Sequence, residues 1–244
     1  MTKELYKDIL KRSDTIYWEL LGNLSGFTKN EENGLKWLSG KGDWIYEINT
    51  SDVDYVIEQI KKNELPKNLF FAFGDISTDP LKSFIESRAF SVKTHCEFMA
   101  LELNDTKINK PSNDIKIFQV TEYWQLKIVA MIQEGQEELF TFKNFEEIMT
   151  MHDTYFYLAE YKGFPASVCM AQFGDDFVNI SWITTLPQFR NKGIAGYLIQ
   201  AIELDAMKAG KKYATLCACD SQKAFIKVGY RKQGEIIKLE YLNK

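Results

Sequence analysis

The sequence predicts a mixed α/β fold in two related halves, each a twisted mixed sheet flanked by helices. Strand-like and helix-like patterns alternate along all 244 residues, as in sheets that are covered by helices. The polar segment 105–114, which contains Pro111, indicates a linker between residues 1–104 and residues 115–244. "FIESRAF" followed by "EFMALEL" in the first half also resembles "FIKVGY" followed by "IIKLEYL" in the second. We therefore predict two related domains in tandem, with chance convergence of ordinary α/β sequences as the alternative.

Apolar spacing and turn residues define six elements in the first half. Residues 4–21 suit a helix that stops at Gly22, and residues 44–48 alternate like a strand. Residues 51–63 place acids first and lysines last, which matches the helix dipole, and Ser51 would cap that helix. The remaining elements are a buried strand at 68–73, a helix at 79–88 and a long strand at 90–103.

The second half repeats this alternation with more strands. Tight turns such as Lys162-Gly163 separate three successive strands, and a long helix at 193–209 follows them. Apolar residues recur in this helix at a spacing that packs one stripe on a sheet: Ala195, Leu198, Ile199, Ile202, Ala206 and Ala209. The expected elements are a strand at 115–120, two helices within 124–151, strands at 154–161, 165–173, 178–185 and 213–217, a short helix at 221–228 and closing strands.

Composition excludes several classes of function. The formal net charge of −4 argues against nucleic acid as a partner, because phosphate neutralisation requires a basic surface. The start "MTKELYKDILKRSD" lacks a signal-peptide core, and no apolar run approaches membrane-spanning length. We therefore expect a cytoplasmic protein with no membrane partner.

The four cysteines, Cys96, Cys169, Cys217 and Cys219, have no CxxC spacing, and the chain has only two histidines. We expect no metal site. Core packing of neutral thiols is the simpler interpretation of these cysteines, and a redox or nucleophilic role is the alternative.

The stretch "LPQFRNKGIAGYLI" suits a site for a pyrophosphate at the start of the long helix. The first backbone N–H groups of a helix have no partner within it, and the helix dipole places positive charge there. Gly193 removes a side chain, Ala195 keeps the next contact small, and Asn191 and Lys192 add a donor and a charge. The alternative is a surface loop closed by a tight turn. The G-x-x-x-x-G-K-[ST] and G-x-G-x-x-G nucleotide loops are absent.

These residues resemble a known family. "ITTLPQFRNKGIAGYLI" is similar to the coenzyme-A-binding motif of the GNAT superfamily of N-acyltransferases, with Pro187, Arg190, Gly193 and Ala195 on the motif positions. "AFIKVGY" resembles the end of the family's second signature, Tyr, three residues, then Gly-Phe. The resemblance covers residues 115–244 and implies a sheet that is splayed near Thr184, where the coenzyme enters.

The first half resembles the tail of a degenerate GNAT-like domain and has no R-x-x-G-x-G/A between its first strand and the helix at 51–63. The resemblance implies that this half has lost coenzyme binding. It would then wall the substrate pocket or pair with a second subunit in a homodimer.

In the family, an acetyl group passes directly from acetyl-CoA to an amine of a small molecule or peptide. The resemblance implies the following coenzyme-binding residues: Ile183, Thr184, Thr185, Arg190, Asn191, Lys192, Gly193, Ile194, Ala195 and Phe225. Family members often protonate the departing thiolate with the Tyr of the second signature, which is Phe225 here. The alternative function is therefore a non-catalytic module that binds acyl-CoA.

The sequence identifies no general base or acid. Asn179 and Ser181 occupy strand positions where a carboxylate would be convenient. His152 and the acids Glu134, Glu137 and Glu138 are candidates, although structural or solvated roles explain them equally simply. Asp220 and Ser221 suit a cap of the short helix that follows. Acidic residues near the pocket would suit a cationic amine such as an aminoglycoside, a polyamine or a protein N-terminus.

Overall fold

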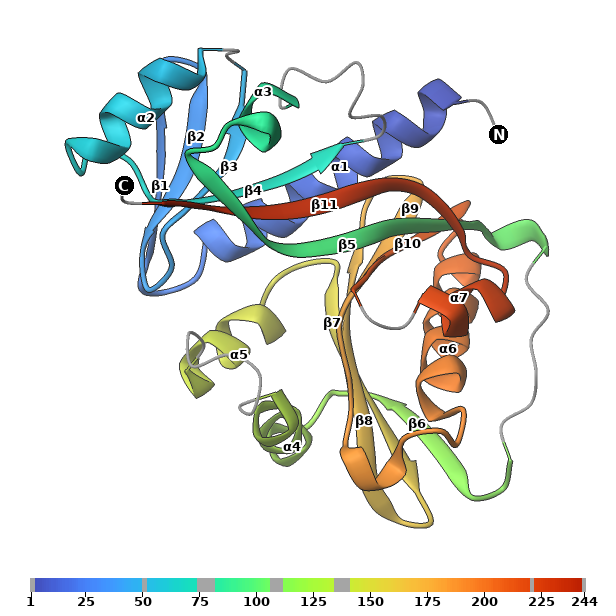
Figure 1. Cartoon of the computed structure of the whole chain (residues 1–244). Helices are drawn as coiled ribbons and strands as arrows, with labels where there is room; N and C mark the ends of the chain where they lie inside the picture. Colours follow the sequence, from blue (N-terminus) through green and yellow to red (C-terminus); the bar gives the residue numbers. More distant parts are fainter. Residues whose placement is uncertain are drawn as a thin grey trace. The chain divides into compact units, whose positions relative to one another are not determined.

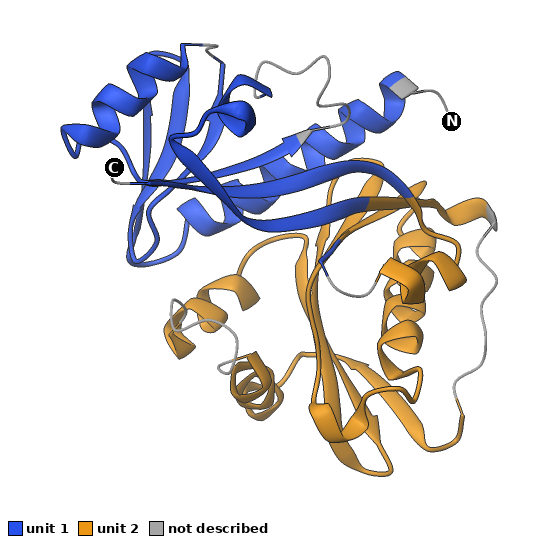
Figure 2. Cartoon of the chain, in the orientation of Figure 1, with its two compact units in different colours: residues 1–98, 218–220, 232–244 blue, residues 99–217, 221–231 orange. Residues whose placement is uncertain are grey.

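The computed structural model describes residues 3–49, 52–73, 82–105, 112–133, 141–219 and 222–242, and the chain divides into two compact units (Figures 1 and 2). Unit 1 comprises residues 1–98, 218–220 and 232–244, and unit 2 comprises residues 99–217 and 221–231. Strands β5 (Phe90–Glu102) and β11 (Arg231–Tyr241) contribute residues to both units. The sequence predicts two related copies of one fold, at residues 1–104 and 115–244. These domain boundaries stay a prediction. Most of the predicted linker, 106–111, lies outside the described residues.

Unit 1 is a sheet with its own apolar core. Its strands lie in the order β1-β2-β3-β4-β11-β5, with β3 and β4 parallel and the pairs β1–β2, β2–β3 and β4–β11 antiparallel. Buried residues of several strands and of α2 and α3 form one apolar cluster, which includes Leu69, Ile60 and Phe84. The elements are α1 Lys3–Gly22, β1 Phe27–Glu32, β2 Leu35–Gly40, β3 Trp44–Ile48, α2 Val53–Lys61, β4 Asn68–Phe73 and α3 Lys82–Glu86.

Two features of unit 1 differ from the sequence prediction. The β1–β2 hairpin was not expected, yet Asn33 and Gly34 at its turn have φ of 50° and 77°. Two positive φ values at an Asn-Gly pair are typical of a two-residue hairpin turn. The cap of α2 is Asp52, whose carboxylate accepts a hydrogen bond from the Tyr55 N–H at 2.9 Å. The expected cap, Ser51, lies outside the described residues.

Unit 2 is a second mixed sheet, in the order β10-β9-β8-β7-β6. All its neighbouring pairs are antiparallel except β9 and β10, which are parallel. Helix α6 packs on β7, β8 and β9 on one face, and α4 and α5 cover the other face (Figure 1). The elements are β6 Ile115–Gln119, α4 Tyr123–Gln133, α5 Phe142–Met149, β7 Thr154–Tyr161, β8 Phe164–Phe173, β9 Phe177–Thr185, α6 Ile194–Lys208, β10 Tyr213–Ala218 and α7 Gln222–Lys227.

The mixed α/β class predicted from the sequence is confirmed. The apolar stripe of α6 is buried at Leu198, Ile199, Ile202 and Ala206, but Ala209 is exposed because the helix ends at Lys208. Among the described residues, no helix is both long enough and apolar enough to cross a bilayer.

The cysteines only partly follow the expected core packing. Cys169 is a buried free thiol, whereas Cys217 is exposed. Within unit 1, Cys96 and Cys219 form a disulfide. The prediction of neutral core thiols was therefore wrong for Cys96 and Cys219, because pairing of cysteines distant in sequence depends on tertiary contacts, and wrong for Cys217, because its side chain is exposed.

Candidate functional site

Strand β9 of unit 2 extends beyond its parallel neighbour. The register with β10 runs from Phe177, opposite Tyr213, to Ile180, opposite Leu216, whereas β9 continues to Thr185. Within this register, the last five residues of β9 therefore have no partner on β10. The expected opening of the sheet near Thr184 is present, and it begins directly after Ile180. An open strand edge of this kind can pair with amide groups of an extended ligand.

A β-bulge interrupts β9 within this opening. Ser181 is paired with Met170 and Thr184 with Val168, so Trp182 and Ile183 together face one residue of β8. Trp182 has φ of 53°, which is uncommon for a large side chain and costs about 1–3 kcal/mol. Because the bulge adds one residue, Ser181 and Thr184 lie on the same face of the sheet, against the usual alternation.

The Trp182 side chain is held by two aromatic rings. Its ring stacks on Phe156 with centroids 6.3 Å apart and meets Phe145 edge-on at 6.0 Å. The buried Gln133 side chain reaches the bulge from the last residue of α4. Its Nε2 donates to the Trp182 carbonyl at 2.5 Å, and its Oε1 accepts from the Thr184 hydroxyl at 3.1 Å. The bulge is therefore fixed by side chains from α4, α5 and β7.

A short loop connects the bulge to α6. It contains a single 3₁₀ turn at Pro187–Phe189, and then Asn191 and Gly193 adopt left-handed conformations with φ of 62° and 75°. Gly193 is the N-cap of α6 and provides no side-chain cap, so the first amides of the helix lack that partner. A Cβ on Gly193 would meet its nearest atom, on Tyr197, only at 3.7 Å. The backbone conformation, and not lack of space, therefore requires glycine here.

Two cations lie in this loop. The Arg190 Nε donates to the Thr185 carbonyl at 3.1 Å, which uses one of the five N–H groups of the guanidinium. The Lys192 ammonium lies over the Tyr161 ring, 5.5 Å from its centroid. Arg190 and Lys192 are both exposed. A left-handed N-cap, first helix amides without a side-chain cap and two cations form an arrangement that suits an anion such as a phosphate.

Comparison with known proteins agrees with this geometry. Residues 120–230 match the model of the acetyltransferase (GNAT) family. The segment is a GNAT-family domain. No curated protein matches the chain significantly in sequence.

Solved structures share the fold along nearly the whole chain. A GCN5-related N-acetyltransferase from Kribbella flavida superposes with a TM-score of 0.72 at 12% identity, covering 96% of both chains. A second, from Sphaerobacter thermophilus, gives a TM-score of 0.66 at 12% identity and covers 98% of this chain and 93% of its own. A tandem GNAT protein from the clavulanic acid biosynthesis pathway gives 0.63 at 10% identity, covering 93% of this chain and 86% of its own. At these identities the likeness establishes the fold alone.

The GNAT domain brings most of the predicted coenzyme-binding residues into one continuous segment. Ile183, Thr184 and Thr185 end β9, and Ile194 and Ala195 begin α6. The Thr184 and Ile194 side chains are buried, so only their backbone groups remain for a ligand. The residues between these two sets, Arg190, Asn191, Lys192 and Gly193, are all exposed in the connecting loop.

Phe225, the remaining predicted residue, lies on the short helix α7. Its side chain is buried and packs on the Tyr230 ring, with centroids 6.3 Å apart. The phenylalanine ring has no proton to donate. Whether this residue contacts the coenzyme stays a prediction.

The GNAT domain also contains a buried carboxyl group that sequence reasoning missed. Glu203 of α6 has no exposed surface, and its Oε1 accepts a hydrogen bond from the Tyr230 hydroxyl at 2.8 Å. Its Oε2 is buried without a partner among the described residues. Burial raises the pKa of Glu203 to about 7, although the Tyr230 hydrogen bond opposes that shift. The signal was present in the sequence, because Glu203 follows Ile199 by four residues on the apolar stripe.

The candidates for a general base remain unassigned. Glu134, Glu137 and Glu138 lie outside the described residues, as do the expected caps Asp220 and Ser221. The His152 side chain is 92% exposed and pairs with the adjacent Asp153.

The two polar residues that we singled out on β9 differ in their surroundings. Asn179 is buried and donates to Gln172 at 3.3 Å. The Ser181 hydroxyl is buried and has no hydrogen-bond partner in the described part of the chain.

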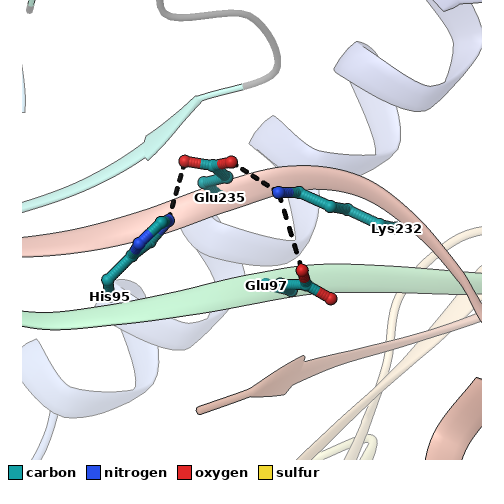
Figure 3. Close-up of polar contacts among 4 residues, drawn as sticks. All are labelled: His95, Glu97, Lys232 and Glu235. Atoms are coloured by element: carbon teal, nitrogen blue, oxygen red, sulfur yellow. Dashed lines mark hydrogen bonds and ion pairs between the residues drawn. The ribbon is translucent and has the colours of Figure 1, made fainter. Parts of the chain in front are cut away.

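Unit 1 contains a separate charged cluster on the neighbouring strands β5 and β11 (Figure 3). The Lys232 ammonium lies 2.5 Å from Glu235 and 3.6 Å from Glu97, and His95 Nε2 lies 2.7 Å from the other Glu235 oxygen. The Lys232 hydrogen bond lowers the pKa of Glu235, and the His95 hydrogen bond contributes to the same shift. These side chains are between 25 and 52% exposed, so solvent screens the interactions. We interpret the cluster as an ion-pair network that links two strands.

Proposed function

We propose that this protein transfers an acetyl group from acetyl-CoA directly to an amine of a small molecule or peptide. The observation that supports the proposal most is the order of two features in the GNAT domain. The edge of β9 opens beyond Ile180, and the same chain then leads to the uncapped first turn of α6. Acetyl-CoA has an extended pantetheine arm followed by a diphosphate, so it requires a strand edge for the arm and a helix start for the diphosphate, in this order.

The residues present fit the coenzyme. Exposed Arg190 and Lys192, with the first amides of α6, provide positive charge and donors for a diphosphate. The backbone of Ile183 to Thr185 would pair with the amides of the pantetheine arm, as an added strand does. When bound, acetyl-CoA supplies an acyl group activated as a thioester.

The bulge would serve the reaction through its backbone. A bulge leaves one residue of the strand without a ladder partner, which frees backbone groups for a ligand. A fixed N–H near Ile183 would donate to the thioester oxygen as negative charge develops there. In the reaction the amine nitrogen bonds to the carbonyl carbon, the carbon–sulfur bond breaks, the nitrogen loses a proton and the sulfur gains one.

Both proton transfers need a partner. An amine with a pKa of about 10.4 must lose a proton before it attacks. The departing thiol has a pKa of about 8.5, so a water molecule can protonate the thiolate at modest cost. We propose this route because Phe225 replaces the family's tyrosine.

The same replacement favours a second candidate function, a module that binds acyl-CoA without turnover. A panel of primary amines with acetyl-CoA, followed by thiol release, separates the two functions. Turnover with at least one amine supports the enzyme. Calorimetric binding of acetyl-CoA without thiol release from any amine would favour the module, and absence of both would refute both functions.

A further inference from the structure

The Gln133 side chain is placed to control the β9 bulge. It is buried at the end of α4, and its two polar atoms contact the two ends of the three-residue segment Trp182 to Thr184. The amide nitrogen donates to the Trp182 carbonyl, and the amide oxygen accepts from the Thr184 hydroxyl. We propose that Gln133 is a positioning residue, which holds the bulge so that its backbone can donate to the thioester oxygen. This inference rests on the function proposed above.

The bulge needs such a support. Trp182 has a left-handed backbone, and a large residue keeps that conformation only where its surroundings enforce it. The Trp182 carbonyl also lies within the segment where the β8 register shifts, and a backbone carbonyl removed from water needs a donor. Gln133 supplies this donor. The rings of Phe145 and Phe156 hold the Trp182 side chain but cannot satisfy its carbonyl.

The chemistry of the contact requires an amide. One end of the side chain must donate to a carbonyl, and the other must accept from a hydroxyl. An ionised glutamate has only acceptors, and methionine, although similar in shape, has no N–H donor. Glutamine therefore satisfies both ends of the bulge at any pH, whereas a glutamate could do so only when protonated.

Hydrogen bonds continue from the bulge to the loop before α6. The buried Ser167 hydroxyl donates to the Thr184 carbonyl at 2.8 Å and lies 2.9 Å from the Thr185 hydroxyl. The Arg190 Nε donates to the Thr185 carbonyl. Gln133 thus begins a network that ends at Arg190, and it fixes the reacting end of the site relative to the end that would bind the diphosphate.

The same helix provides a matched control. Gln125 is also buried on α4, but its Oε1 accepts hydrogen bonds from the Thr121 and Glu122 N–H groups, both at 3.0 Å. A carboxylate can replace that acceptor, and the start of a helix favours its charge. Gln125→Glu should therefore preserve the local structure, whereas Gln133→Met, and Gln133→Glu when it is ionised, remove the donor to Trp182.

The test measures turnover, coenzyme binding and backbone exchange in the full chain. We expect ionised Gln133→Glu to lower kcat by up to about 100-fold, the effect of losing an oxyanion donor, because the N–H near Ile183 would no longer be held in place, while the Kd for acetyl-CoA changes less than about threefold. Amide hydrogen exchange within residues 181–185 should rise at least about tenfold, because the opening of the bulge becomes easier. Gln125→Glu should change none of these quantities. Gln133→Met, which adds no charge to the interior, should reproduce the effects if Gln133→Glu does not fold.

The outcomes are distinguishable. If the wild type transfers acetyl groups and Gln133→Met keeps wild-type kcat, the inference is wrong and the proposed function stands. If the wild type has no activity with any amine, the proposed function fails, and with it the catalytic role of Gln133. Unchanged exchange within 181–185 in Gln133→Met would show, with or without turnover, that Gln133 does not hold the bulge. Equal losses of kcat, coenzyme affinity and thermal stability would indicate general destabilisation and also overturn the inference.

Discussion

Arg190→Glu reverses a charge at the proposed diphosphate site and should weaken coenzyme binding with little effect on folding. Two unit charges about 5 Å apart in water interact by about 0.8 kcal/mol. Replacing a cation by an anion beside a doubly charged diphosphate would therefore cost about 3 kcal/mol unscreened, and about 2 kcal/mol at physiological ionic strength. This corresponds to a Kd for acetyl-CoA about 30-fold higher. Because Arg190 is exposed, the free energy of unfolding should change by less than about 0.5 kcal/mol.

Isothermal titration with acetyl-CoA measures this change, and Lys212→Glu provides the control. Lys212 is exposed and follows the opposite end of α6, a helix of 15 residues, or about 22 Å. At that distance salt screens the charge, so Lys212→Glu should leave the Kd within about twofold. Equal affinities of Arg190→Glu and the wild type would refute the site. Equal weakening by both variants would show that net charge alone governs binding.

Two further predictions concern stability. Gly193→Ala should destabilise the protein by about 1–2 kcal/mol because residue 193 has a left-handed φ. Gly196→Ala should stabilise it by about 1 kcal/mol, because residue 196 lies inside α6 and a Cβ there has ordinary space. Denaturant unfolding measures both free energies, and changes of the same sign would contradict the assigned backbone conformations. The raised pKa of Glu203 means that the folded state binds its proton more tightly than the unfolded state. Its contribution is therefore fully present below about pH 4.5 and is lost as the pH rises through about 7. Glu203→Gln should accordingly gain stability over the wild type between pH 5 and 8, by up to about 3 kcal/mol, and a constant difference across this range would contradict the buried charge.

Local patterns were sufficient for most elements of unit 2. The expected strand at 154–161 coincides with β7, and the helix expected at 193–209 differs from α6 by one residue at each end. Both have strong signals, a segment rich in aromatic residues in one and an apolar stripe with a preceding glycine in the other. The β1–β2 hairpin was missed because β1 is mostly polar and exposed, so it shows little apolar alternation despite the Asn-Gly turn.

The sequence was sufficient to predict the loop of the candidate site, but not the bulge of β9 or the side chains that hold it. Arg190 to Ala195 could be located because glycine and charge beside a helix start have a direct physical meaning. The bulge at Trp182 has no such signal, since "NISWITT" reads as an ordinary strand. Gln133 lies about 50 residues earlier, and Ser167 lies on another strand. Their roles depend on tertiary contacts that no local pattern records.

The most direct test of the central claim is amide hydrogen exchange with and without acetyl-CoA. If the edge of β9 and the first turn of α6 bind the coenzyme, exchange should slow in peptides that cover residues 181–185 and 190–197, while the β1–β2 hairpin of unit 1 stays unchanged. Binding confirmed by titration, with protection confined to other segments, would contradict the account.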